Sequence, residues 1–129
     1  MNGVLSSPNR IVALALGAGV AGYGGFALAT GRPILGTLFG GAGVVLVVAG
    51  LLGITAARRA NVGVGTAWLA LGYIGLFLVG TEFNLPGLGA LGEVGLFAAS
   101  VAHLAVGLGA RRDRDAAPAP ADAPAPPLP

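Results

Sequence analysis

The stretch Leu88–Ala110, LGALGEVGLFAASVAHLAVGLGA, decides the fold prediction. It is almost wholly apolar and, at about 1.5 Å of rise per residue, long enough as a helix to cross a hydrocarbon core of about 30 Å. Two ionisable side chains, Glu93 and His103, lie inside this apolar block, and an arginine cluster follows it at Arg111, Arg112 and Arg114. The stretch therefore predicts a membrane-spanning helix and marks where a functional site is to be sought.

Three further apolar blocks, residues 11–30, 34–57 and 62–80, precede it along the chain. Hydrophobic residues make up 55% of the 129 residues and charged residues only 9%, against about 25% charged in a soluble domain. Only helices and closed barrels satisfy the backbone in lipid, and the blocks show no alternation of period two. The sequence predicts an all-α integral membrane four-helix bundle.

The chain divides into three parts by composition. Residues 1–10 form a polar N-terminal segment, residues 11–110 the transmembrane domain, and residues 111–129 an Ala/Pro-rich tail. Such a tail cannot bury apolar area and is predicted to be disordered.

Arginine placement predicts the topology. In a four-span arrangement six arginines lie on one side, and Arg32 alone lies on the other. Short loops rich in Arg stay in the cytoplasm, so we expect a multi-pass protein of the cell (inner) membrane with both termini cytoplasmic. The six arginines on the first side are Arg10, Arg58, Arg59, Arg111, Arg112 and Arg114.

An alternative interpretation makes the first apolar block, residues 11–30, a signal peptide that is cleaved after its A-x-A-like end Ala27-Leu28-Ala29.

The residue inventory excludes several classes of chemistry. The chain has no cysteine, which excludes disulfides, thiolate catalysis and iron–sulfur clusters. The net charge of +2 comes from arginines at block ends, where they anchor helices, so we expect no nucleic-acid partner. Because His103 is the only histidine, we also expect no haem or metal cofactor.

Small residues at a spacing of four predict close helix packing. Gly36 with Gly40 and Gly95 with Ala99 are two such pairs. They serve either contacts within one bundle or a homodimer face, for which Gly36 and Gly40 are the better candidates.

Spans one and three resemble each other, because residues 22–28 and 72–78 share Gly, Tyr, Gly and Leu at an offset of 50. This match favours a parallel two-helix repeat. Together with the entry Asn9-Arg10 and the run Gly41–Ala57, these Gly-Tyr-x-Gly units make residues 8–110 resemble the DUF4383 family of small four-helix actinobacterial membrane proteins. The resemblance implies a fold and a membrane location and carries no established activity.

The candidate polar intramembrane site consists of Glu93, Ser100 and His103. Glu93 and His103 are ten positions apart, or about 15 Å along a helix and about 80° around it. Ionisable groups within a membrane are costly and are therefore functional candidates. Three interpretations remain open. In the first, Glu93 lies near the outer headgroups and reaches water. In the second, the neutral imidazole of His103 is hydrogen-bonded to Ser100 or to a facing threonine. In the third, Glu93 and His103 form a relay for protons or a solute. Trp68 is expected at the membrane interface.

Two functions follow from this inventory. The first is a structural or accessory membrane protein, alone or as a subunit of a larger membrane complex, without enzymatic activity because no catalytic set is evident. The alternative is a small proton-coupled transporter that uses Glu93 and His103. The transporter requires both side chains to face one cavity.

Overall fold

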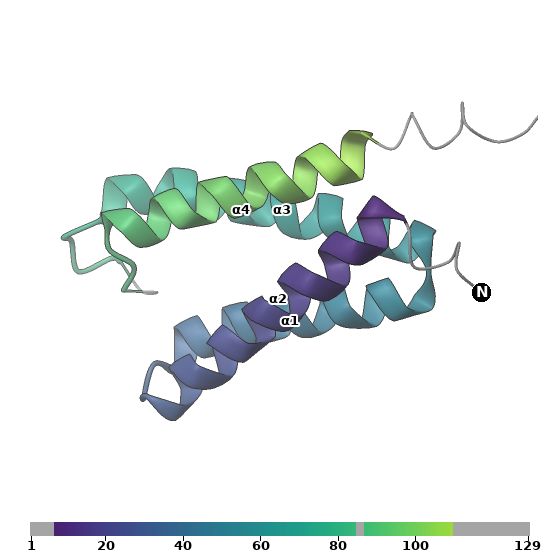
Figure 1. Cartoon of the computed structure of the whole chain (residues 1–129). Helices are drawn as coiled ribbons and strands as arrows, with labels where there is room; N and C mark the ends of the chain where they lie inside the picture. The colour runs from purple at the N-terminus through teal and green to yellow at the C-terminus, as the bar shows by residue number, and fades with distance from the viewer. Residues whose placement is uncertain (1–6, 85–86, 110–129) are drawn as a thin grey trace, which may run out of the picture.

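The computed structural model describes residues 7–84 and 87–109, which form four α-helices and no strand (Figure 1). All four helices are long and apolar enough to cross a membrane, which confirms the predicted all-α membrane fold. The predicted tail, with Arg111 and Arg112, lies outside the described residues. The helices are α1 (Pro8–Ala29), α2 (Pro33–Leu52), α3 (Ile54–Leu78) and α4 (Ala90–Gly109).

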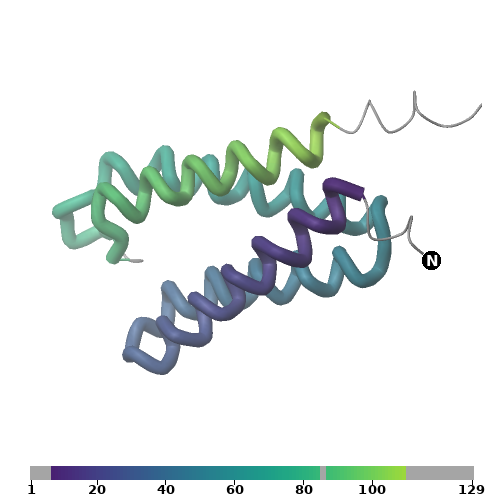
Figure 2. Tube along the Cα trace, viewed as in Figure 1, coloured from purple at the N-terminus to yellow at the C-terminus, as the bar shows by residue number. Residues whose placement is uncertain are grey.

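The four helices form two hairpins, because α1 packs along α2 and α3 packs along α4, with fewer contacts between the pairs. The hairpins converge where α1 begins, α2 meets α3 and α4 ends, and they diverge toward the α1–α2 and α3–α4 connections (Figures 1 and 2). We call these the closed end and the open end of the bundle. The molecule is thus a V of two helical hairpins joined at the closed end.

The predicted connection at residues 58–61 was wrong, since the chain turns instead at Gly53. Gly53 has φ +137°, a conformation that only glycine adopts readily. Arg58, Arg59 and Asn61 therefore lie in the first turns of α3, within the helix that crosses the membrane. The predicted N-terminal segment, residues 1–10, also ends earlier than expected. Helix α1 begins at Pro8, so Asn9 and Arg10 belong to α1.

Glycine lets α1 and α2 approach closely. A Cβ on Gly24 would overlap the backbone nitrogen of Gly40, and a Cβ on Gly43 would overlap the backbone nitrogen of Ala21. A Cβ on Gly36 would lie 2.8 Å from the backbone nitrogen of Leu28. Gly36 and Gly40, the predicted packing pair, thus face α1 of their own chain.

The two hairpins repeat the same burial pattern. In α1 the buried residues Ala13, Gly17 and Gly24 have buried counterparts 48 positions later in α3, namely Asn61, Gly65 and Gly72, and the buried Arg10 corresponds to the partly buried Arg58. In α2 the buried residues Gly36, Gly43, Leu46 and Gly50 have counterparts 57 positions later in α4, namely Glu93, Ser100, His103 and Gly107. The first-helix offset is 48 rather than the 50 of the sequence match, which pairs the exposed Gly22 with the buried Gly72.

The repeat extends to a pair of arginine contacts. Arg10 Nε donates to the carbonyl oxygen of Gly50 at 2.8 Å, and Arg58 Nε donates to that of Gly107 at 2.9 Å. Both acceptors lie in the last turn of the second helix of their hairpin, where carbonyl groups have no partner further along the helix. Each arginine therefore ties the start of one helix to the end of the next at the closed end.

Candidate functional site

Asn61 holds three helices together at the closed end. Its Nδ2 donates to the backbone oxygen of Asn9 at 3.0 Å and to Oδ1 of Asn9 at 3.2 Å, and its Oδ1 lies 2.9 Å from Nδ1 of His103. Asn61 and His103 are fully buried, and Asn9 is 1% exposed. Because α1, α3 and α4 each supply one of these residues, the cluster joins the two hairpins by polar contacts inside the bundle.

The hydrogen-bond directions in this cluster follow from its acceptors. The backbone oxygen of Asn9 can only accept, so the amide nitrogen of Asn61 must face it and the amide oxygen must face His103. The amide oxygen of Asn61 can likewise only accept, so Nδ1 of His103 must carry a hydrogen and donate it to Asn61 Oδ1. The expected partner of His103, Ser100 or a facing threonine, was wrong, because Ser100 Oγ donates to Phe97 O of its own helix.

An aromatic row leads from His103 toward the open end. The ring centroids of His103 and Trp68 are 5.5 Å apart, those of Trp68 and Phe39 are 5.5 Å apart, and those of Phe39 and Tyr23 are 5.3 Å apart. Trp68 is only 5% exposed and lies near the middle of α3, so its expected place at the membrane interface was wrong. Its indole separates the polar cluster from the space beyond.

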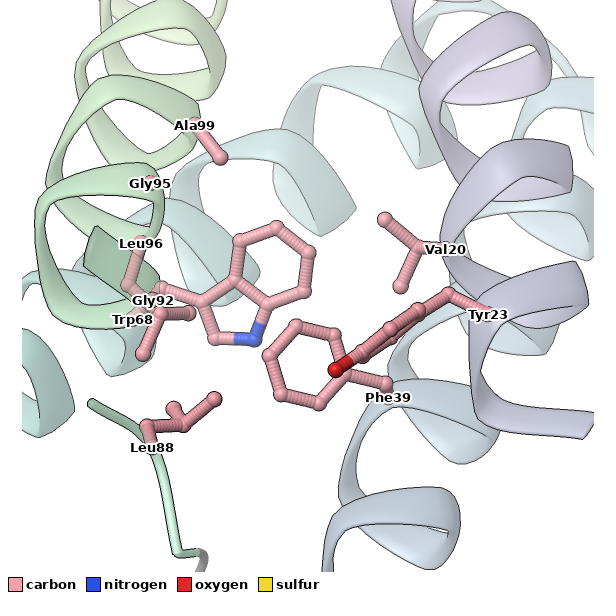
Figure 3. Close-up of a pocket in the computed structure, with 9 residues that line it drawn as sticks. All are labelled: Val20, Tyr23, Phe39, Trp68, Leu88, Gly92, Gly95, Leu96 and Ala99. Atoms are coloured by element: carbon pink, nitrogen blue, oxygen red, sulfur yellow. The ribbon is translucent and has the colours of Figure 1, made fainter. Parts of the chain in front are cut away.

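That space is an apolar cleft of about 220 Å³ between the hairpins (Figure 3). Every helix contributes to it, and α4 supplies Leu96 and three small residues, Gly92, Gly95 and Ala99. A Cβ on Gly95 would meet no atom within 4 Å. The predicted pair Gly95 and Ala99 thus faces the cleft, and Gly95 is not used for close packing within the described residues.

Glu93 lies apart from this cleft. Its side chain is 1% exposed and rests against Gly75 of α3, where a Cβ would overlap the carboxyl group. The expectation that Glu93 reaches headgroup water is wrong for the isolated chain. Glu93 lines a second cavity of about 350 Å³, beside α3 residues and Asn84 of the α3–α4 connection.

The three predicted site residues therefore do not form one site. Glu93 lines the cavity beside α3, Ser100 bonds within its own helix, and His103 belongs to the closed-end cluster. Neither described cavity is lined by both Glu93 and His103. Among the described residues no group of three His, Asp or Glu side chains could hold a metal ion.

Sequence reasoning missed Asn61 and the role of Trp68. A signal was present, since Asn61, Gly65, Trp68, Gly72 and Gly75 recur at alternating steps of four and three and are all buried in α3. That spacing marks one helix face. Placing a connection at residues 58–61 removed Asn61 from the face to which it belongs.

Comparison with known proteins returned no matching family model, curated protein or solved structure.

Proposed function

We propose that this chain is a small, non-catalytic accessory protein of the membrane, whose hairpins hold the apolar cleft for a helix of a partner membrane protein. One observation carries this proposal: Asn9, Asn61 and His103 at the closed end are joined by hydrogen bonds, whereas the cleft toward the open end is apolar and has three small residues of α4 along its border, Gly92, Gly95 and Ala99. Small residues let helix backbones approach closely in lipid, so this border suits a helix.

The transporter remains the alternative, with one observation in its favour. Glu93 Oε2 and His103 Nε2 are both buried, and neither has a hydrogen-bond partner among the described residues. A relay needs a second titratable group in reach of the first, and His103 is held by Asn61 outside the cavity that Glu93 lines. The accessory role is therefore the better supported of the two.

A matched pair of tyrosines tests the accessory role. Tyr23 lines the cleft, whereas Tyr73, 62% exposed, lies on the bundle surface. We expect a photoreactive benzoylphenylalanine at position 23 to give a discrete protein adduct in native membranes, and the same group at position 73 to label only lipid. An adduct of twice the chain's mass would identify the partner as a second copy. Lipid adducts alone at position 23, with recovery of a lone monomer in mild detergent, would contradict the proposal.

We further propose that the closed end faces the cytoplasm of a cell (inner) membrane. Arg10, Arg58 and Arg59 belong to helix turns at that end, and Arg32 lies in the connection at the open end, so the arginine asymmetry supports this orientation. We expect a single cysteine at Glu82 to react with an impermeant thiol reagent on intact cells, and a cysteine at Thr55 to react only after lysis. Both positions are exposed. The reverse pattern would invert the topology.

A further inference from the structure

The cavity beside α3 is distinct from the inter-hairpin cleft, since no residue lines both. It has a volume of about 350 Å³, within the range of about 300–1,000 Å³ common for small-ligand sites. Most of its wall is apolar and comes from α3, including Ala70, Leu71, Ile74 and Leu78. Whatever fills it must therefore present an apolar body to α3.

Two polar atoms at this cavity have no hydrogen-bond partner in the part of the chain that the structure describes. Glu93 Oε2 and Asn84 Oδ1 are both buried, and neither accepts a hydrogen bond from the described residues. Asn84 is oriented by its own Nδ2, which donates to the backbone oxygen of Leu88 at 2.7 Å and leaves the amide oxygen free to accept. A buried polar atom without a partner costs about 1–3 kcal/mol, so a ligand that satisfied both atoms would gain from the exchange.

The repeat shows which change in sequence makes room for the carboxyl group of Glu93. Glu93 occupies the position that Gly36 holds in the first hairpin, and Gly75, against which it rests, occupies the position of Ala27. Loss of one methyl group at Gly75 accommodates the larger side chain at residue 93. No described residue forms a hydrogen bond with Glu93 Oε2. Packing alone therefore does not account for the presence of glutamate at position 93 and glycine at position 75.

From these contacts we infer that the cavity binds a lipophilic amine, whose N–H groups donate to Glu93 and Asn84 and whose hydrocarbon part lies along α3. Two acceptors at the same cavity call for a ligand with more than one donor, which an ammonium group supplies. Hydrogen bonds between ionised groups are stronger than neutral ones, and a ligand cation compensates a carboxylate that is costly in lipid. This inference goes beyond the proposed accessory function and does not depend on it.

The test uses the full chain in lipid nanodiscs, with empty nanodiscs as background, and three probes of one chain length. We expect tritiated decylamine to bind saturably at one site per chain, and decyltrimethylammonium and decanol to bind at least about tenfold more weakly, because they lack either the N–H donors or the charge. Equal binding of all three probes, or only non-saturable uptake of decylamine, would overturn the proposal.

Four variants, compared by the same binding assay, separate the site from general effects. Glu93→Gln should weaken decylamine binding by about tenfold or more, whereas Glu82→Gln, the same change at an exposed loop residue, should not. Ala70→Leu places a larger side chain in the exposed wall of the cavity and should abolish decylamine binding. Ala98→Leu makes the same change on the exposed face of α4, outside the cavity lining, and should leave binding unchanged.

Reactivity of the wild-type carboxyl group gives a readout that needs no variant. Dicyclohexylcarbodiimide, a reagent for membrane-buried carboxyl groups, should modify Glu93, and decylamine should protect it where decanol does not. Unchanged modification at saturating decylamine would place the amine elsewhere and contradict the proposal.

Discussion

Replacing Gly24 with Ala is expected to lower the free energy of unfolding by about 2–3 kcal/mol, at the upper part of the range typical of overpacked cores. The new Cβ would overlap the backbone nitrogen and Cα of Gly40 and lie 2.9 Å from the backbone oxygen of Gly36. Backbone atoms cannot rotate away as a side chain can. The variant therefore has to separate α1 from α2 over the face where the first hairpin packs most closely.

The neighbouring glycine provides the control. A Cβ on Gly25 would meet no atom within 4 Å, so Gly25→Ala should leave stability unchanged or raise it slightly through helix propensity. Both variants can be compared by titration from mild detergent into dodecyl sulfate, followed by circular dichroism and by the fluorescence of Trp68, the only tryptophan. Equal midpoints for the two variants would show that the hairpin does not depend on this contact.

Composition predicts the fold class because it leaves few alternatives. With 9% charged residues the surface must face lipid, and in lipid blocks of about 20 residues can only be helices. The ends of the helices are harder to predict. Gly53 ends α2 through its positive φ, yet it is one of 24 glycines, most of which lie inside helices, whereas Arg58 and Arg59 look like the natural boundary.

The candidate site was predicted only in part because its contacts cross helices. The sequence identifies Glu93 and His103 as unusual from their chemistry alone. It does not show that Asn61, 42 positions from His103, supplies the partner, or that Gly75 admits the carboxyl group of Glu93. Such pairings depend on which faces of α3 and α4 meet, and a sequence rich in Gly, Ala and Leu marks those faces weakly.

The repeat shows where the second hairpin carries polar residues in place of apolar ones. At equivalent positions the first hairpin has Ala13 and Leu46 where the second has Asn61 and His103. Ala13 and Leu46 pack together in an apolar cluster, whereas Asn61 and His103 form a hydrogen bond. The second hairpin thus follows the architecture of the first with polar contacts in place of apolar ones, and these contacts reach α1 through Asn9.

Asn61→Leu is therefore expected to loosen the joint between the hairpins while leaving each hairpin intact. The variant keeps the side-chain size but removes the partner of His103 Nδ1 and the donor to Asn9. Hydrogen bonds between membrane helices contribute about 0.6–2 kcal/mol each, and orphaned buried groups add to the loss, so we expect the free energy of unfolding to fall by about 2–3 kcal/mol. Spin labels at the exposed Ile11 of α1 and Leu108 of α4 should report a longer, broader distance at the closed end.

A double-mutant cycle distinguishes this joint from a general loss of packing. If Asn61 and His103 act together, the variant carrying both Asn61→Leu and His103→Leu should be less destabilised than the sum of the single variants, by about 0.5–2 kcal/mol. Thr66→Val is the matched control on α3, because Thr66 is exposed and donates only to Val62 O of its own helix, so it should change neither stability nor the measured distance. Additive effects, with an unchanged distance in Asn61→Leu, would mean that the hairpins are held by apolar contacts alone and that the polar cluster is not their joint.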